Sequence, residues 1–193
     1  MPRLRSLASL KKLDKNSALV QTNAIRKTVM VSNKTLKDLL CLLADSEIPF
    51  VVVGGYAARM HGTSLLTEDI DVCAILSKDR VQKIRQILAP YHPVHRMTPK
   101  KLSLLEFPED ITLINNLYVS TDMGQIDFLG SVGGVGDFES VSRNAVEVSI
   151  FGRKCKVISI DDLIAAKKFM GRPHDLETIK QLEWIKKRLA KQP

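Results

Sequence analysis

Two aspartates separated by one residue, Asp69 and Asp71, have the types and spacing best suited to chemistry in this sequence. They lie in an apolar run typical of a β-strand, where residues i and i+2 point to one face with Cα atoms about 7 Å apart. Two carboxylates that close repel each other unless a cation lies between them. Oxygen ligands of this kind suit Mg²⁺, which adds water and phosphate oxygens to complete its shell. Alternatively, both residues form the solvent-exposed face of a half-buried strand.

A third acidic residue, Asp127, is predicted to join this pair, because it interrupts an apolar strand-like run at 126–129 where an aspartate is otherwise costly. In a site for two metal ions, one ion activates an acceptor hydroxyl and the other steadies a triphosphate and its leaving pyrophosphate. Asp127 would lie on the acceptor side, as a metal ligand and a candidate general base. Asp122 is a rival for this place, but a turn at 122–124 explains it adequately.

Phosphate contacts are predicted on the segment that precedes the aspartates. Gly54 and Gly55 follow a strand-like run. Without Cβ atoms, they let backbone N–H groups and the start of the next helix approach a phosphate closely. Ser64 and Thr67 lie on the approach to the aspartates and are candidate phosphate donors, although loop Ser and Thr usually stabilise turns. The glycine-rich run at 133–136 lacks the lysine of a P-loop and is predicted to be a flexible crossing.

The elements that must position these residues mix strands and helices without strict βαβ regularity. This pattern predicts an α/β (α+β) fold, a mixed sheet flanked by helices with a helical segment at the C-terminus. The expected strands cover 48–53, 70–76, 116–121, 125–129, 146–150 and 154–158, the last two as a hairpin. The expected helices are one capped by Ser32 or Asn33 with Leu36, Leu39, Leu40 and Leu43 on one face, and others at 56–61, 77–88, 161–170 and 175–190, the last burying Ile179, Leu182, Ile185 and Leu189.

The charge of the chain is unevenly placed. Of the net +8, residues 1–30 carry +6 and residues 180–193 carry +4, which leaves the body at −2. Such basic ends attract a polyanion such as RNA, or they form a solvated surface. The N-terminal segment is predicted to be an amphipathic helix, and a mitochondrial-type presequence would look similar.

The remaining composition narrows the setting of the protein. No apolar stretch approaches the roughly 20 residues that a bilayer crossing needs. The three cysteines are widely separated, which favours neither a disulfide framework nor a zinc site and suggests a reducing cytoplasm.

The order Gly54-Gly55, Asp69-x-Asp71 and Asp127 resembles the core signature of polymerase-β-like nucleotidyltransferases. The segments 161–167 and 171–176 resemble the C-terminal part of the AbiEii-type branch of toxin–antitoxin systems. The resemblance covers about residues 35–190. It predicts a basic N-terminal extension at 1–30 and a nucleotidyltransferase domain at 31–193 that ends in two helices at about 161–190.

This resemblance implies an enzyme that moves a nucleoside monophosphate from an NTP such as ATP to an acceptor, using Mg²⁺, expected as two ions, and releasing pyrophosphate. Asp69 and Asp71 would bind both ions, and Asp127 would complete the acceptor-side ion. Gly54 and Gly55 would contact the triphosphate. The basic ends favour RNA or tRNA as the acceptor over a protein hydroxyl or a small molecule, as in antibiotic modification. A cognate antitoxin is an implied partner.

Three details complete what the resemblance implies. Lys167 would neutralise phosphate charge, while Asp175 would cap a helix or pair with Arg172. Relatives often carry an arginine four residues before the first aspartate, where this chain has Leu65.

Two alternatives to this enzyme stay open: a non-catalytic module that keeps the fold, and a protein whose carboxylates serve phosphate hydrolysis.

Overall fold

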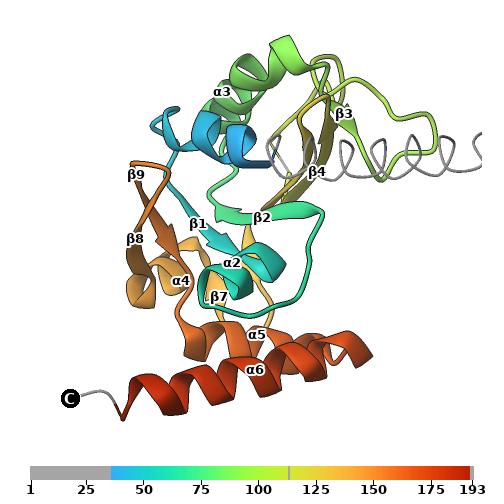
Figure 1. Cartoon of the computed structure of the whole chain (residues 1–193). Coiled ribbons are helices and arrows are strands. Elements are labelled where there is room, and N and C mark those ends of the chain that lie inside the picture. Colours follow the sequence, from blue (N-terminus) through green and yellow to red (C-terminus); the bar gives the residue numbers. More distant parts are fainter. Residues whose placement is uncertain (1–35, 113, 192–193) are drawn as a thin grey trace, which may run out of the picture.

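The computed structural model describes residues 36–191 with the exception of residue 113, so the predicted N-terminal extension and the cap at Ser32 or Asn33 lie outside the described residues. A seven-stranded mixed sheet, in the order β3-β4-β5-β2-β1-β9-β8, forms the frame. Helices α5 and α6 pack side by side at one end of the view in Figure 1, and α3 lies at the opposite end. The predicted mixed sheet flanked by helices is therefore confirmed.

The elements have the following bounds. The strands are β1 (Phe50–Val53), β2 (Asp69–Ala74), β3 (Val94–His95), β4 (Asn116–Thr121), β5 (Gly124–Leu129), β6 (Ser131–Val132), β7 (Gly136–Asp137), β8 (Val146–Ile150) and β9 (Arg153–Val157). The helices are residues 36–44, α2 (Gly54–Met60), α3 (Lys78–Leu88), the 3₁₀ turn η1 (Ala89–Tyr91), α4 (Phe138–Asn144), α5 (Ile160–Met170) and α6 (Pro173–Leu189).

The centre of the sheet is β2, which pairs antiparallel with β1 and parallel with β5. Side chains alternate between the two faces of a strand, so Ile70 and Val72 point to one face and the aspartates of β2 to the other. Ile70, Val72 and their neighbours Ile126 and Phe128 on β5 are fully buried. This apolar face fixes the register, since a slip by one residue would turn the aspartates into the core.

Several boundaries differ from the prediction. The first strand begins at Phe50, after Pro49, which has no N–H to donate to a neighbouring strand. Helix α2 begins at Gly54 directly after the strand, and not at residue 56. The predicted crossing at 133–136 connects two short strands, β6 and β7, which pair with each other. Helix α4 follows it, where the Asp137 side chain accepts a hydrogen bond from Ser140 N, and sequence analysis had missed this helix.

The two C-terminal helices occur where they were predicted, with one error in the buried face of α6. Ile179 and Leu182 are buried, whereas Leu189 is 54% exposed because the helix extends beyond the body at its last turn. Within the part of the chain that the structure describes, every helix is too short or too polar to cross a membrane. The three cysteines are free thiols.

A buried ion pair joins the two C-terminal helices. Lys167 Nζ on α5 donates to Asp175 Oδ1 on α6 at 2.7 Å, and the Asp175 side chain is 1% exposed. Asp175 was expected to cap a helix or to pair with Arg172. Helix α6 has no side-chain cap, and Arg172 is exposed and lies before the helix. The pairing with Arg172 is therefore wrong, because α6 turns Asp175 inward against α5.

Asp175→Asn is expected to lower the free energy of unfolding by about 3 kcal/mol, because it leaves the half-buried Lys167 charge without its counter-ion. The matched control is Glu147→Gln, which breaks the exposed pair with Lys154 and should barely change stability. Urea denaturation of both variants measures the difference. If both variants lost the same free energy of unfolding, the buried Lys167–Asp175 pair would stabilise the protein no more than the exposed pair.

Candidate active site

The three predicted carboxylates converge on one face of the sheet. Asp71 on β2 lies directly beside Asp127 on β5 in the parallel register, and Asp69 lies beside Gln125. Oxygen atoms from Asp69, Asp71 and Asp127 all lie within 4.8 Å of one another. The rival Asp122 is outside this cluster and instead bonds His92 Nδ1 through Oδ2 at 2.6 Å.

This convergence is electrostatically costly for the folded chain. Burial, followed by the nearby charges of Asp69 and Asp127, raises the pKa of Asp71 to about 6. Burial also raises the pKa of Asp127, although the guanidinium of Arg96 opposes the shift. Like charges in a poorly hydrated place favour the protonated acids. A bound cation would relieve the same repulsion.

The donor set fits a divalent metal ion. All three side chains offer hard carboxylate oxygens, the ligand type that Mg²⁺ prefers. Asp127 is 4% exposed, and its Oδ1 is buried with no hydrogen-bond partner among the described residues. Asp162 and Asp175 also have an unpartnered buried oxygen, but only Asp127 lies beside two further carboxylates, where an ion would satisfy that oxygen. Asp69, Asp71 and Asp127 are the residues that would hold it.

Gly54 is required by the position of Asp71. Its φ angle is +61°, and a Cβ added there would lie 2.0 Å from Asp71 Oδ2. The backbone N–H of Gly55 faces the Asp71 carboxylate and opposes the rise of its pKa. A Cβ on Gly55 would lie 2.8 Å from Thr67 Oγ1. The two glycines therefore form a ledge against which Asp71 and Thr67 pack.

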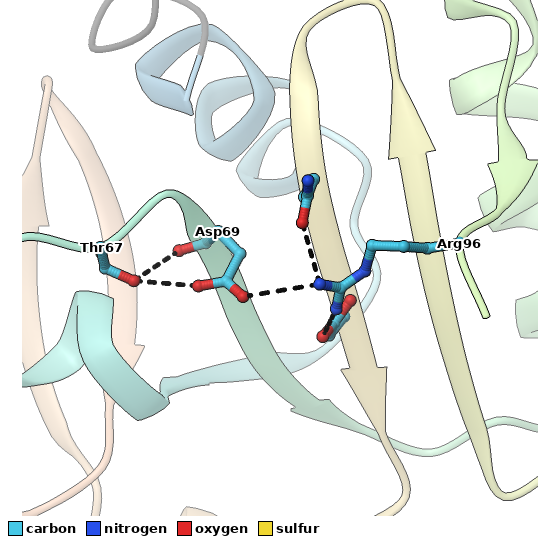
Figure 2. Close-up of polar contacts among 5 residues, drawn as sticks. Thr67, Asp69 and Arg96 are labelled. Atoms are coloured by element: carbon cyan, nitrogen blue, oxygen red, sulfur yellow. Dashed lines mark hydrogen bonds and ion pairs between the residues drawn. The ribbon is translucent and has the colours of Figure 1, made fainter. Parts of the chain in front are cut away.

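The remaining predicted site residues divide between the cluster and the C-terminal helices. Thr67 Oγ1 donates to Asp69 Oδ1 at 2.9 Å, so it belongs to the cluster (Figure 2). Ser64 instead donates its backbone N–H to Gln181 Oε1 of α6 at 3.0 Å. Lys167 pairs with Asp175, but its charge still lowers the pKa of Asp71. Leu65 is partly buried in the same loop.

Sequence analysis missed Arg96, the residue after β3. Its Nη2 bonds Asp127 Oδ2, its Nη1 donates to Gln125 Oε1 at 2.9 Å, and Asp69 Oδ2 lies 3.9 Å from Nη1. Figure 2 shows the Arg96 side chain extending toward Asp69, with a dashed line between the two. Only the pairing of β3 with β4, which the local sequence does not reveal, could have identified Arg96.

Comparisons with known proteins bear on the fold. No protein-family profile matches the sequence, and no curated protein matches it in sequence. The structure is similar to that of the lincosamide antibiotic adenylyltransferase LnuA with lincomycin bound, at 18% identity and a TM-score of 0.52, over 79% of this chain and 96% of that one. It is also similar to the antibiotic-resistance factor ANT(2'')-Ia, at 13% identity and a TM-score of 0.50, over 84% and 92% of the two chains.

The chain therefore has the fold of the nucleotidyltransferases. The mixed α/β nucleotidyltransferase fold predicted from the sequence is confirmed, while membership of the polymerase-β-like superfamily stays a prediction. The closer likeness to the AbiEii-type branch stays a prediction. Identities this low speak to the fold alone, so the chemistry has to be argued from the site.

Gly54→Ala is expected to displace the Asp71 carboxylate and to weaken Mn²⁺ binding at least about ten-fold, since a ligand oxygen now occupies the place of the new methyl group. Gly152→Ala is the control: its φ angle is +80° with no atom within 4 Å of an added Cβ. Both variants bear the backbone strain of a left-handed alanine, about 1 kcal/mol. Isothermal titration with Mn²⁺ should separate them, and equal binding by both would contradict the packing argument.

Stability without metal should depend on pH through Asp71. Because its folded pKa is about 6 and its ordinary value is 3.8, the folded state holds this proton more tightly than the unfolded state. Ionisation therefore removes stability as pH rises from about 4 to about 6, on the order of 3 kcal/mol. Asp71→Asn should gain stability over the unmodified protein across that range, measured by urea denaturation in EDTA. For the exposed control Asp38→Asn, the difference in unfolding free energy from the unmodified protein should stay the same between about pH 4 and about pH 6. The same behaviour in Asp71→Asn would contradict the raised pKa of Asp71.

Proposed function

We propose that this protein is a metal-dependent nucleotidyltransferase that moves a nucleoside monophosphate from an NTP to an acceptor hydroxyl and releases pyrophosphate. The observation that carries the proposal is the convergence of Asp69, Asp71 and Asp127 around a buried, unpartnered carboxylate oxygen. The glycine ledge beside Asp71 adds a surface that a triphosphate can approach closely.

Each residue has a role in this proposal. Asp69 and Asp71 bind the ions, and Thr67 fixes the orientation of Asp69 through its hydroxyl. Asp127 accepts the proton of the acceptor hydroxyl, because it would lie on the acceptor side of the metal site. The acceptor oxygen forms a bond to the α-phosphorus while the bond to the leaving pyrophosphate breaks. Mg²⁺, expected as two ions, would activate the hydroxyl and offset the phosphate charge when bound by the three aspartates.

Four of the predicted residues are candidates for contacts with the phosphates of the NTP: Gly54, Gly55, Lys167 and Ser64. The backbone N–H groups of Gly54 and Gly55 would donate hydrogen bonds to the triphosphate when Asp71 is bound to metal. Lys167 would contribute its charge from a fixed place, because Asp175 holds its amine. Ser64 is the weakest candidate, since Gln181 already binds it.

For the acceptor, RNA or tRNA is our first choice, because the last turn of α6 carries Lys186, Lys187 and Arg188. A cytoplasmic toxin with a cognate antitoxin is the corresponding biological role. The names of the two similar structures favour a second candidate, a small hydroxyl-bearing molecule, with ATP as donor. A non-catalytic module is disfavoured, because it would retain three repelling carboxylates without using them.

The proposal predicts label transfer from an α-³²P-NTP, in the presence of Mg²⁺, to one component of a mixture of total RNA, lysate protein and small hydroxyl compounds. Asp71→Asn should reduce the transfer at least about 100-fold, because the substitution removes a ligand charge at the centre of the cluster. The matched control Asp122→Asn, outside the cluster, should retain it. Pyrophosphate must be the released product.

Other outcomes of this experiment separate the alternatives. Release of orthophosphate instead of pyrophosphate would indicate hydrolysis. Absence of label transfer from all four NTPs would favour the binding module. If RNA is labelled, expression in bacteria should slow growth, and co-expression of a neighbouring gene should restore it.

A further inference from the structure

Arg96 lies where a cation would be expected in the acidic cluster. Its guanidinium bonds Asp127 Oδ2, and Nη1 is 3.9 Å from Asp69 Oδ2. Among the ion pairs of the described residues, no other lysine or arginine reaches Asp69 or Asp127. Arg96 thus bridges Asp69 and Asp127, two of the three carboxylates that are expected to hold the acceptor-side ion.

The sheet itself delivers Arg96 to this place. The pairing of His95 with Val119 puts the next residue opposite Tyr118, whose carbonyl accepts from Arg96 N at 2.8 Å. Tyr118 in turn lies opposite Asp127, which lies beside Asp71. Arg96 therefore continues a row formed by Tyr118, Asp127 and Asp71 on the strands β4, β5 and β2. The arginine enters the cluster from the edge of the sheet.

The guanidinium is held by hydrogen bonds only at its two terminal nitrogens. Its two bonded nitrogens contact Asp127 and Gln125, whereas Nε is buried without a hydrogen-bond partner among the described residues. The side chain is 27% exposed, so a path to solvent exists. The Tyr118 ring lies 5.9 Å from the guanidinium carbon and offers it a second resting place.

We infer that Arg96 is an internal counter-ion of the acidic cluster, which must leave Asp127 before a divalent ion can bind between Asp127 and Asp69. Arginine keeps its charge at every physiological pH, so it cannot yield by losing a proton. It has to move, and the free energy of its contacts with Asp127 is lost when metal binds. This inference rests on the metal site proposed above and adds a residue that sets the metal affinity of that site.

The test is titration of Mn²⁺ into the full chain by calorimetry, with Arg96→Met as the main variant. Removal of the competing cation should tighten Mn²⁺ binding about ten-fold, the value of one charge-assisted hydrogen bond. Arg96→Lys, which keeps a charge but loses the two-pronged contact, should lie between. The matched control is Arg153→Met. On the exposed surface, Arg153 donates to both carboxylate oxygens of Asp45, at 2.7 and 2.6 Å, and this variant loses that contact. Its affinity should not change.

Salt separates direct competition from a long-range field. Each titration is repeated at 50 and 500 mM KCl, since the field of a charge not in contact is screened at high salt. The gain in Arg96→Met should persist at 500 mM. Equal affinity in the two proteins, or a gain that disappears at high salt, would overturn the inference. Absence of Mn²⁺ binding by every protein, including the unmodified chain, would instead refute the proposed metal site.

A second measurement observes the arginine directly and needs no variant that must fold without its counter-ion. In ¹⁵N spectra of the unmodified chain, the Nε–H signal of Arg96, assigned by its loss in Arg96→Lys, should shift when Mg²⁺ is added. The signal of Arg153 should stay in place. An unmoved Arg96 signal under saturating Mg²⁺ would show that the guanidinium does not leave, and would overturn the inference.

Discussion

The parallel pairing of β2 with β5 sets the Asp71 carboxylate beside that of Asp127, with the Asp69 carboxylate close to both. Three like charges in one partly buried place raise the free energy of the folded chain. The surroundings are arranged to tolerate this: Gly54 leaves room for Asp71, Thr67 binds Asp69, and Arg96 binds Asp127. In a purely structural domain, this repulsion would destabilise the fold without any benefit. A bound cation would offset the repulsion.

The sequence allowed the acidic cluster to be predicted because the signals are local. Asp69 and Asp71 share a face by strand alternation, and Asp127 interrupts an apolar run. The buried face of β2 and β5, with Ile70 and Phe128, follows from the same alternation. The mixed sheet could be predicted as a class, but its strand order could not, since order depends on pairings between distant segments.

The residues that could not be predicted depend on contacts between such distant segments. β3 has only two residues, too few for a periodic pattern, so nothing in the local sequence pointed Arg96 at Asp127. Ser64 looked like a phosphate donor from its place in the chain, yet α6 captures it through Gln181. Asp175 was assigned to the nearby Arg172, whereas the packing of α6 on α5 gave it to Lys167. In each case tertiary packing selected a partner that proximity in sequence did not suggest.

The same strand pairing has a consequence for how the chain folds. Asp71 and Asp127 are separated by the whole crossover that contains α3, η1, β3 and β4. Contacts between residues so distant in sequence form slowly, because a long loop must close first. The carboxylates are therefore far apart in early folding species, and their repulsion is felt only as the last central strand docks. Magnesium present at that step would favour docking, so the ion that we propose for the finished site would also assist its assembly.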